Sequence, residues 1–482
     1  MENKLAQKTR LITEGPIVKS LFLIAWPIVF ANTLHTAYQL IDTFWVGRLG
    51  APAVAAVSVS FPMLFFLLGF GFGLSIAASV FVAQFAGARR HEMVNHVTAQ
   101  TILMVVVISL LLSVVGYYTA PSVLRLIGIG PDIFADTIRY LRISYIGLIF
   151  SYGFILFQSI LRGIGEVRFP LYVIIATVLL NAILDPLFIF GWGPVPGFGV
   201  SGAAYATLIT QGIAAVVGIG VLFGGRYGIR LKAADFIPDW RFIHEAVKVA
   251  LPASIEQTTR TLGSIMLTFL ATGFGTVSLA TLGLGMRIMS FVFIPAFGLG
   301  MATTTLVGQN IGAGNILRAE QAARLSGWVG FWSLNVFAVL FYLFAEPLVR
   351  LFVPADEALV ASGVEFVSIA TISFGVIGAQ QALLGAFRGA GGTMSAMAIS
   401  LVTQWILQFP VSYILCMHTP LGVAGIWWGF PIANIIATIL TVIWFQYGTW
   451  QDLKLMEQGI PPEALHKHTL IDDAASEQEY IN

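Results

Sequence analysis

The chain has 482 residues, of which 57% are hydrophobic and only 10% are charged. Because soluble globular domains carry about 25% charged residues, this composition excludes a soluble protein and predicts a polytopic membrane protein. A formal net charge of +1 gives no basis for nucleic-acid binding, and a single cysteine, Cys416, excludes an internal disulfide.

Apolar segments of about 20 residues are long enough to cross a bilayer as helices. Twelve such segments are predicted, near 20–47, 53–83, 94–118, 133–160, 169–191, 200–223, 242–271, 277–308, 319–343, 358–386, 393–416 and 421–447. Arg and Lys gather in the loops and tails on one side of these spans, a set in which we count Arg162 and Arg388. By the positive-inside rule both termini are cytoplasmic, with an N-terminal segment at 1–19 and a polar tail at 448–482.

The first span carries a single acid, since Asp42 is the only charged residue between Lys19 and Arg48. An acid at membrane depth costs about 2.5–3.5 kcal/mol on insertion scales, so it marks a functional site unless Asp42 is only a rim residue. His35, Tyr38 and Asp42 share one helix face. Two interpretations of His35 stay open, a proton carrier or a hydrogen-bonded packing residue. Pro27 removes a backbone donor and predicts a bend in this helix.

The two halves of the chain repeat each other at a shift of about 225 residues. The shift aligns Pro27 with Pro252, Gln84 with Gln309, Gly87 with Gly312 and, at 226, Arg162-Gly163 with Arg388-Gly389. Six spans per half give both halves the same orientation. We therefore expect an all-α protein of two parallel six-helix repeats, 20–223 and 242–447, joined by a linker at 224–241. Such repeats suit alternating access around a cavity between them.

A second membrane acid, Asp185, lies in the fifth span with Asn181 one turn before it. The repeat places Leu267 opposite Asp42 and Phe409 near Asp185, so only the first half carries these acids. Similar depths predict one polar pocket formed by Tyr38, Asp42, Asn181, Asp185 and Thr207. Its oxygen atoms suit Na⁺ (at Asp42, Asn181, Asp185 and Thr207) or a proton shared between carboxylates. The alternative is that Asn181 and Thr207 only join helices.

The second half offers fewer candidates. Glu256 and Arg260 are four residues apart and are most simply a neutralising pair within one helix, while Arg287 is a candidate for the cavity wall. The sequence has no GxxxxGK[ST] phosphate loop and no HExxH motif. We therefore predict a transporter that draws on an ion gradient, not an enzyme, and expect no cofactor.

Several motifs in this order resemble the multidrug and toxic compound extrusion (MATE) family, and most closely its DinF-like branch. They are IDTFWVGRLG around Asp42, VAQFAGARR at 82–90 with its echo VGQNIGAGN at 307–315, LRGIGEVRFP at 161–170, and NAILDP followed by GVSGAAYATL at 199–208. The resemblance spans about 17–450 and implies two lobes in a V shape. It also implies a bend at Pro27 and an ion site of Tyr38, Asp42, Asn181, Asp185 and Thr207. The resemblance further implies the Ala203 carbonyl as an extra candidate ligand, and Tyr140 is a weaker match to a polar residue that lines this lobe.

One departure from the family pattern concerns the second lobe. Another branch of the family places cation-binding acids on spans seven and ten, but here the inner part of span ten, 366–387, has no acid, only Gln380 and Gln381. The resemblance thus implies an H⁺ or Na⁺ antiporter for amphipathic, cationic or aromatic compounds in the plasma membrane, surrounded by lipid and monomeric. The alternatives are a flippase for lipid-linked precursors, which needs a strongly cationic cavity, and a channel or membrane enzyme.

Overall fold

The computed structural model describes residues 2–354, 356–448 and 450. The first half of this part of the chain is helical throughout. After a short helix α1 (Glu2–Glu14) it forms α2 (Ile17–Gly47), α3 (Ala51–Gly87), α4 (His91–Ile127), α5 (Pro131–Ile146), α6 (Leu148–Gly163), α7 (Arg168–Phe190) and α8 (Val200–Phe223). The predicted tail at 448–482 lies outside the described residues except for Gly448 and Trp450.

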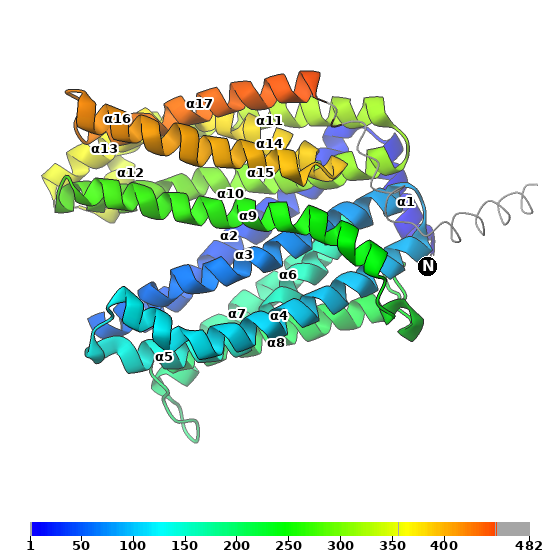
Figure 1. Cartoon of the computed structure of the whole chain (residues 1–482), viewed down its shortest axis with the longest axis horizontal. Coiled ribbons are helices and arrows are strands. Elements are labelled where there is room, and N and C mark those ends of the chain that lie inside the picture. Colours follow the sequence, from blue (N-terminus) through cyan, green and yellow to red (C-terminus); the bar gives the residue numbers. More distant parts are fainter. Residues whose placement is uncertain (1, 355, 449, 451–482) are drawn as a thin grey trace, which may run out of the picture.

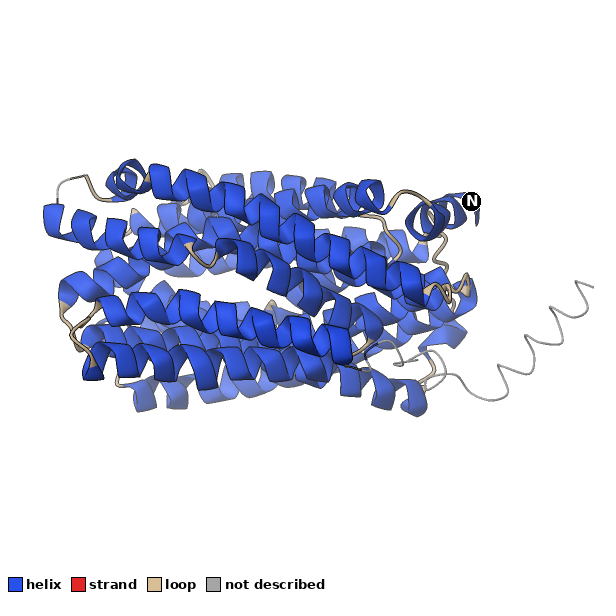
Figure 2. Ribbon diagram, turned by 90° about the horizontal axis from the view of Figure 1, so that it is seen from above, coloured by secondary structure: helices blue, strands red, loops and turns tan. Residues whose placement is uncertain are grey.

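The second half repeats this order. A linker with a 3₁₀ turn, η1 (Ala233–Phe236), leads to the second half. That half comprises α9 (Trp240–Thr272), α10 (Thr276–Gly312), α11 (Ile316–Leu343), α12 (Ala345–Phe352), α13 (Glu357–Thr371), α14 (Phe374–Ala390), α15 (Thr393–Leu401), a π-helical segment η2 (Val402–Gln408), α16 (Phe409–His418) and α17 (Ala424–Tyr447). The long helices run along one common axis (Figure 2).

The spans match the predicted ones within four residues at each end, except that α4 runs to Ile127, nine residues past the predicted end at 118. Nine described helices are long and apolar enough to cross a membrane, and counting each of two bent pairs as one span gives eleven. The remaining span is α9, whose polar residues, among them Glu256 and Arg260, lower its hydropathy. The fold prediction of twelve spans is confirmed.

Two spans predicted as single helices are broken at matching places of the repeat. The fourth bends by 46° between α5 and α6, around Gly147, and the tenth bends by 51° between α13 and α14, next to Ser373. Gly50 and Gly275, which the repeat also aligns, begin α3 and α10 with φ of 102° and 93°. Only glycine adopts such angles without strain. A glycine with positive φ therefore precedes the second long helix of each half.

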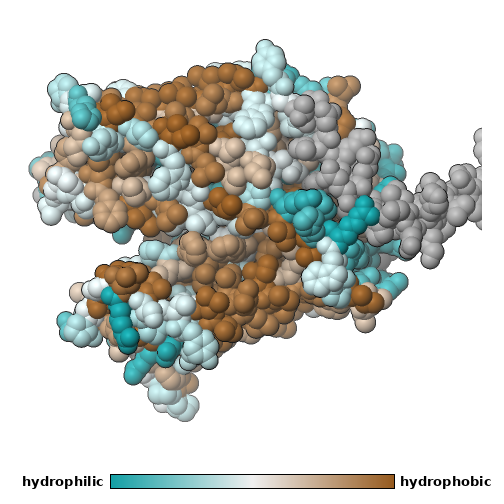
Figure 3. All heavy atoms as spheres, in the orientation of Figure 1, coloured by the Kyte–Doolittle hydropathy of each residue, from teal (hydrophilic) through white to brown (hydrophobic). Residues whose placement is uncertain are grey.

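The two halves form two lobes that meet at the end of the molecule near α1 and separate toward the other end, which gives the V shape (Figure 1). Apolar side chains cover broad stretches of the outer surface, and the surface is hollowed between the lobes at the end away from α1 (Figure 3). We call this the open end and the end near α1 the closed end.

The closed end is held by a reciprocal contact between repeat-related residues. Gln84 on α3 donates from its side-chain amide to the Gly389 carbonyl at 3.0 Å, and Gln309 on α10 donates to the Gly163 carbonyl at 2.7 Å. The glycines of the two helices permit close approach, since a Cβ at Gly312 would lie 2.7 Å from the carbonyl carbon of Gln84. Residues that the sequence repeat aligns therefore make equivalent contacts between the two lobes.

Helix α1, predicted only as part of a cytoplasmic segment, packs across both lobes at the closed end. On the first lobe Lys8 pairs with Glu166, and Arg89 pairs with Glu14 at 3.0 Å. On the second lobe Arg318 donates to the carbonyl of Gly15. The span predicted at 20–47 corresponds to α2, which begins three residues earlier at Ile17, and the segment before it forms a helix held by contacts distant in sequence.

Candidate functional site

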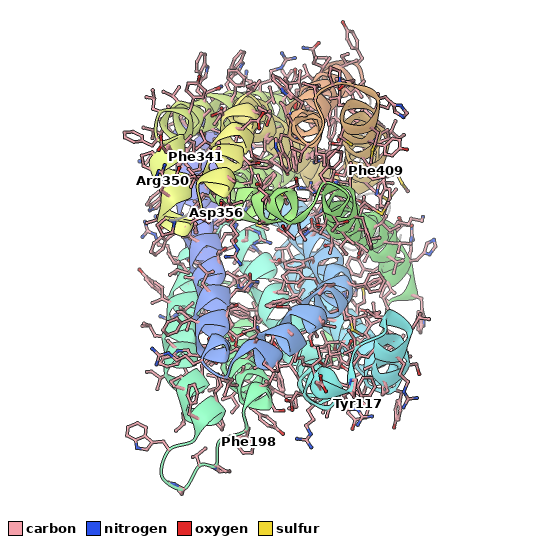
Figure 4. The ribbon with its side chains drawn as sticks, turned by 90° about the vertical axis from the view of Figure 1, so that its left-hand side faces the viewer. Tyr117, Phe198, Phe341, Arg350, Asp356 and Phe409 are labelled. Atoms are coloured by element: carbon pink, nitrogen blue, oxygen red, sulfur yellow. The ribbon has the colours of Figure 1, made fainter. Side chains whose placement is uncertain are left out.

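A cavity of about 420 Å³ lies between the lobes. We call it the central cavity. Its walls are α2, α3, α5, α6 and α8 of the first lobe, with Ile174 of α7, and parts of α9, α10 and α14 of the second. Figure 4 views the molecule from the open end, with Tyr117 and Phe198 of the first lobe in its lower part and Phe341, Arg350, Asp356 and Phe409 of the second in its upper part. Most of the wall belongs to the first lobe, the lobe in which the sequence places both membrane acids.

Helix α2 contributes one polar face to the cavity. His35, Tyr38 and Asp42 all line it, as their spacing predicts. The Tyr38 hydroxyl is 3.0 Å from the Thr210 hydroxyl on α8, and its ring stacks with His35 at 6.3 Å between centroids. His35 itself is exposed to the cavity, whereas the Asp42 side chain is 5% exposed. Asp42 is therefore a nearly dehydrated carboxyl group beside open space.

The other predicted residues lie around Asp42. Asn181 and Asp185 on α7 are fully buried, and the Asn181 amide donates to Asp185 at 3.0 Å. Thr207 of α8 and Tyr140 of α5 line the central cavity, while Ala203 is buried and outside the lining. Asp42, Asp185, Tyr38 and Tyr140 are close enough to interact electrostatically. The structure thus brings the set together in two layers, with Asn181 and Asp185 behind the wall.

Three oxygen atoms of this group are buried without a hydrogen-bond partner among the described residues. They are Oδ1 of Asp42, Oδ2 of Asp185 and Oδ1 of Asn181. A buried acceptor without a donor costs about 1–3 kcal/mol, so the arrangement favours a species that supplies positive charge. Carboxylate and amide oxygens suit a proton or a hard cation such as Na⁺. Among the described residues, no group of three or more His, Cys, Asp or Glu forms a metal site.

The second lobe holds its acid in a different state. Glu256 is 1% exposed and pairs with Arg260 at 2.9 Å, the pair that the spacing predicts. It also pairs with Arg388 of α14 and accepts from Ser400 at 3.2 Å. Gln380 and Gln381 are buried on the same helix as Arg388. Because three side chains donate to the Glu256 carboxylate, this acid is paired, whereas Asp42 of the first lobe is not paired with any described residue.

Two arginines lie elsewhere than the sequence interpretation placed them. Arg162 and Arg388 were assigned to loops on the cytoplasmic side, but both line the central cavity. Arg162 of the LRG motif lies in the last turn of α6, and Arg388 of the FRG motif lies in the last turn of α14. Each is on the side of its helix that faces the cavity. The signal was available in the repeat, since both motifs align. Arg287, in contrast, is exposed and outside the cavity lining.

Pro27 is buried inside α2, which runs from Ile17 to Gly47 as one helix. The missing backbone donor at Pro27 lies between the closed end and the polar face that carries Asp42. The bend there stays a prediction.

A two-lobe, repeat-built helical protein with a central cavity and a buried acidic site is a membrane transporter. The MatE family model matches residues 27–187 and 252–414, one match in each lobe, and the chain belongs to this family, whose members are transporters and not enzymes. The matches begin 225 residues apart, as the internal repeat does.

Curated relatives agree over nearly the whole chain. The probable multidrug resistance protein YpnP of Bacillus subtilis (strain 168) is 29% identical over 452 residues, which cover 92% of this chain and 98% of the relative. The probable multidrug resistance protein NorM of Thermotoga maritima is 28% identical over 443 residues, covering 90% and 93%. A solved structure described as the outward-facing conformation of a multidrug resistance MATE family transporter has a TM-score of 0.86 at 23% identity, covering 93% and 99%. This likeness confirms the fold.

Proposed function

We propose that the chain is a cation-coupled antiporter that exports amphipathic small molecules, often cationic or aromatic, across the plasma membrane. The names of the curated relatives, probable multidrug resistance proteins, support export of drugs or metabolites. With both termini in the cytoplasm, the open end faces outward. The moving units are then the lobes 20–223 and 242–447, with the linker 224–241 between them, in a protein that acts as a monomer.

The observation that carries the proposal is the pair of buried carboxylates with unsatisfied oxygens. Asp42 reaches the cavity while Asp185 lies behind it, so a proton or Na⁺ entering from the open end meets Asp42 first. Binding there neutralises the site and changes the hydrogen bonds around Tyr38 and Asn181. Since α2 lacks one backbone hydrogen bond at Pro27, it is the helix that bends at least cost. The bend narrows the cavity and expels substrate, provided that the two shapes bind it with different affinities.

The experiment is export of ethidium from proteoliposomes with a proton or a Na⁺ gradient imposed separately. Asp42→Asn removes the charge while keeping the size, and should abolish gradient-driven export without loss of folded protein. Asp132→Asn, at the exposed start of α5, is the matched control and should export normally. Export by Asp42→Asn at the wild-type rate would refute the coupling role. A flippase for lipid-linked precursors, the alternative function, would show no gradient-driven export in any variant.

A further inference from the structure

The closed end of the central cavity is basic and rich in hydroxyl groups. The cavity face of α6 ends with Gln158, Ser159 and Arg162, the last of which is one residue before the helix ends. Helix α3 crosses this end of α6 closely, because a Cβ at Gly163 would lie 2.9 Å from the carbonyl oxygen of Ser79. Ser79, and Ser75 one turn before it, also line the cavity. Arg162 and these serines thus share one corner of the wall.

Arg162 has no acidic partner there. Its guanidinium donates to the Ser159 hydroxyl at 2.7 Å, and no carboxylate lies within ion-pair distance of it among the described residues. The repeat makes the contrast clear, because Arg388 occupies the same place in the second lobe and pairs with Glu256. At the shift of 225 the counterpart of Glu256 is Ala31, which lines the cavity. The first lobe therefore keeps the arginine of this motif, but an alanine stands where the second lobe has the glutamate that pairs with it.

The two serines are unsatisfied as well. Ser75 and Ser79 are each 2% exposed, and neither hydroxyl has a hydrogen-bond partner within the part of the chain that the structure describes. Their counterparts in the second lobe are Gly300 and Thr304, and Thr304 donates to the carbonyl of Gly385 at 2.9 Å. Two buried donors beside an unpaired guanidinium form a set of groups that an anion satisfies, since charge-assisted hydrogen bonds are the strong ones.

The positions of the two charges give the cavity a polarity. Asp42 lies near the end of α2 at the open end, and Arg162 lies near the end of α6 at the closed end. We propose that Arg162, with the hydroxyls of Ser75, Ser79 and Ser159, is a subsite for an anionic group of the substrate, such as a carboxylate, a sulfonate or a phosphate. The inference rests on the proposed function and sharpens it: the preferred cargo is zwitterionic or anionic amphiphiles, not purely cationic ones.

The test compares two dyes that differ only at one carboxyl group. Rhodamine 110 has a free carboxylate, and rhodamine 123 is its methyl ester. Binding of each to purified protein in phosphatidylcholine nanodiscs is measured by fluorescence polarisation. The wild type should bind rhodamine 110 more tightly than the ester by about tenfold, the value of one hydrogen bond to a charged group. Equal affinities, or no binding of rhodamine 110, would overturn the subsite.

The variant Arg162→Gln should bring the ratio of the two affinities to about one, and Arg162→Lys should restore part of it. Ser79→Ala should lower the ratio less, because it removes one neutral donor. Arg287→Gln, which removes an exposed arginine outside the cavity lining, is the matched control and should keep the wild-type ratio. If Arg162→Gln lowers both affinities by the same factor, Arg162 is structural and the proposal fails.

Two further arms separate the sources of the result. Weaker binding of rhodamine 110 after addition of phosphatidylglycerol, with no such effect in Arg162→Gln, would identify a lipid headgroup as a second anion that uses the subsite. Gradient-driven export of rhodamine 123 from vesicles tests the antiport function by itself. Export that persists when the carboxyl preference is absent sinks only the subsite. A carboxyl preference without export sinks only the antiport function.

Discussion

Adding a single methyl group at the closed end should shift the conformational equilibrium of the protein toward states in which the two lobes are separated at that end. In Gly312→Ala the added Cβ would lie 2.7 Å from the carbonyl carbon and 2.8 Å from the Cα of Gln84. Ordinary contacts between carbon atoms are about 3.5–4.0 Å. Both opposing atoms are backbone and cannot rotate away, so α3 and α10 must separate by about 1 Å. The same conflict exists at Gly87, which lies equally close to Gln309.

That displacement breaks the two hydrogen bonds that hold the closed end, from Gln84 to Gly389 and from Gln309 to Gly163. At about 0.5–1.5 kcal/mol for each bond, the closed arrangement loses about 1–3 kcal/mol. The ratio of the conformation that is open at this end to the one that is closed there should therefore rise by about 5- to 160-fold.

The measurement is a distance distribution by double electron–electron resonance between spin labels at Arg90 and Leu317. Both positions are exposed and lie at the repeat-related starts of α4 and α11, one in each lobe. The background is Cys416→Ser, which removes the only native thiol. Gly283→Ala, on the same helix α10, is the control, because a Cβ there would meet no described atom within 4 Å beyond the backbone of its own helical turn. A distribution that is identical in Gly312→Ala and Gly283→Ala would refute the reasoning.

Three further substitutions test individual residues. Glu256→Gln leaves Arg260 and Arg388 without a buried counter-charge, which costs about 3–5 kcal/mol, so the thermal unfolding midpoint in detergent should fall by several degrees; an unchanged midpoint would show that the charges are hydrated. Pro27→Ala should keep ethidium binding but slow its export, and an unaltered rate would remove the bend from the mechanism. Thr210→Val removes the hydrogen-bond partner of the Tyr38 hydroxyl. It should shift the pH dependence of export and have little effect on the amount of folded protein. A loss of folded protein with no change in the pH dependence would make Thr210 purely structural.

The local features of this protein follow from its sequence. Span positions, the repeat, and the contacts of Asn181 with Asp185 and of Glu256 with Arg260 depend on apolar length and on helical spacing. These features follow from the length of the apolar segments and from the 3.6 residues per turn of an α-helix, which contacts with other helices do not change. The mirrored glycine positions Gly50 and Gly275 are local in the same sense, because a positive φ requires glycine wherever it occurs.

Contacts between residues on different helices could not be predicted from the sequence, because they depend on how the helices pack. Arg388 reaches Glu256 from 132 residues away, and Tyr38 meets Thr210 across 172. The side chains of Arg162 and Arg388 face the cavity because their helices extend past the predicted span ends, and charge counting alone assigned them to loops. Which helix face meets a neighbour, and whether an arginine there finds a carboxylate, depends on packing between segments that the linear pattern does not relate. The fold brings Arg388 to Glu256, whereas the corresponding position of the first lobe is Ala31, so Arg162 has no such partner.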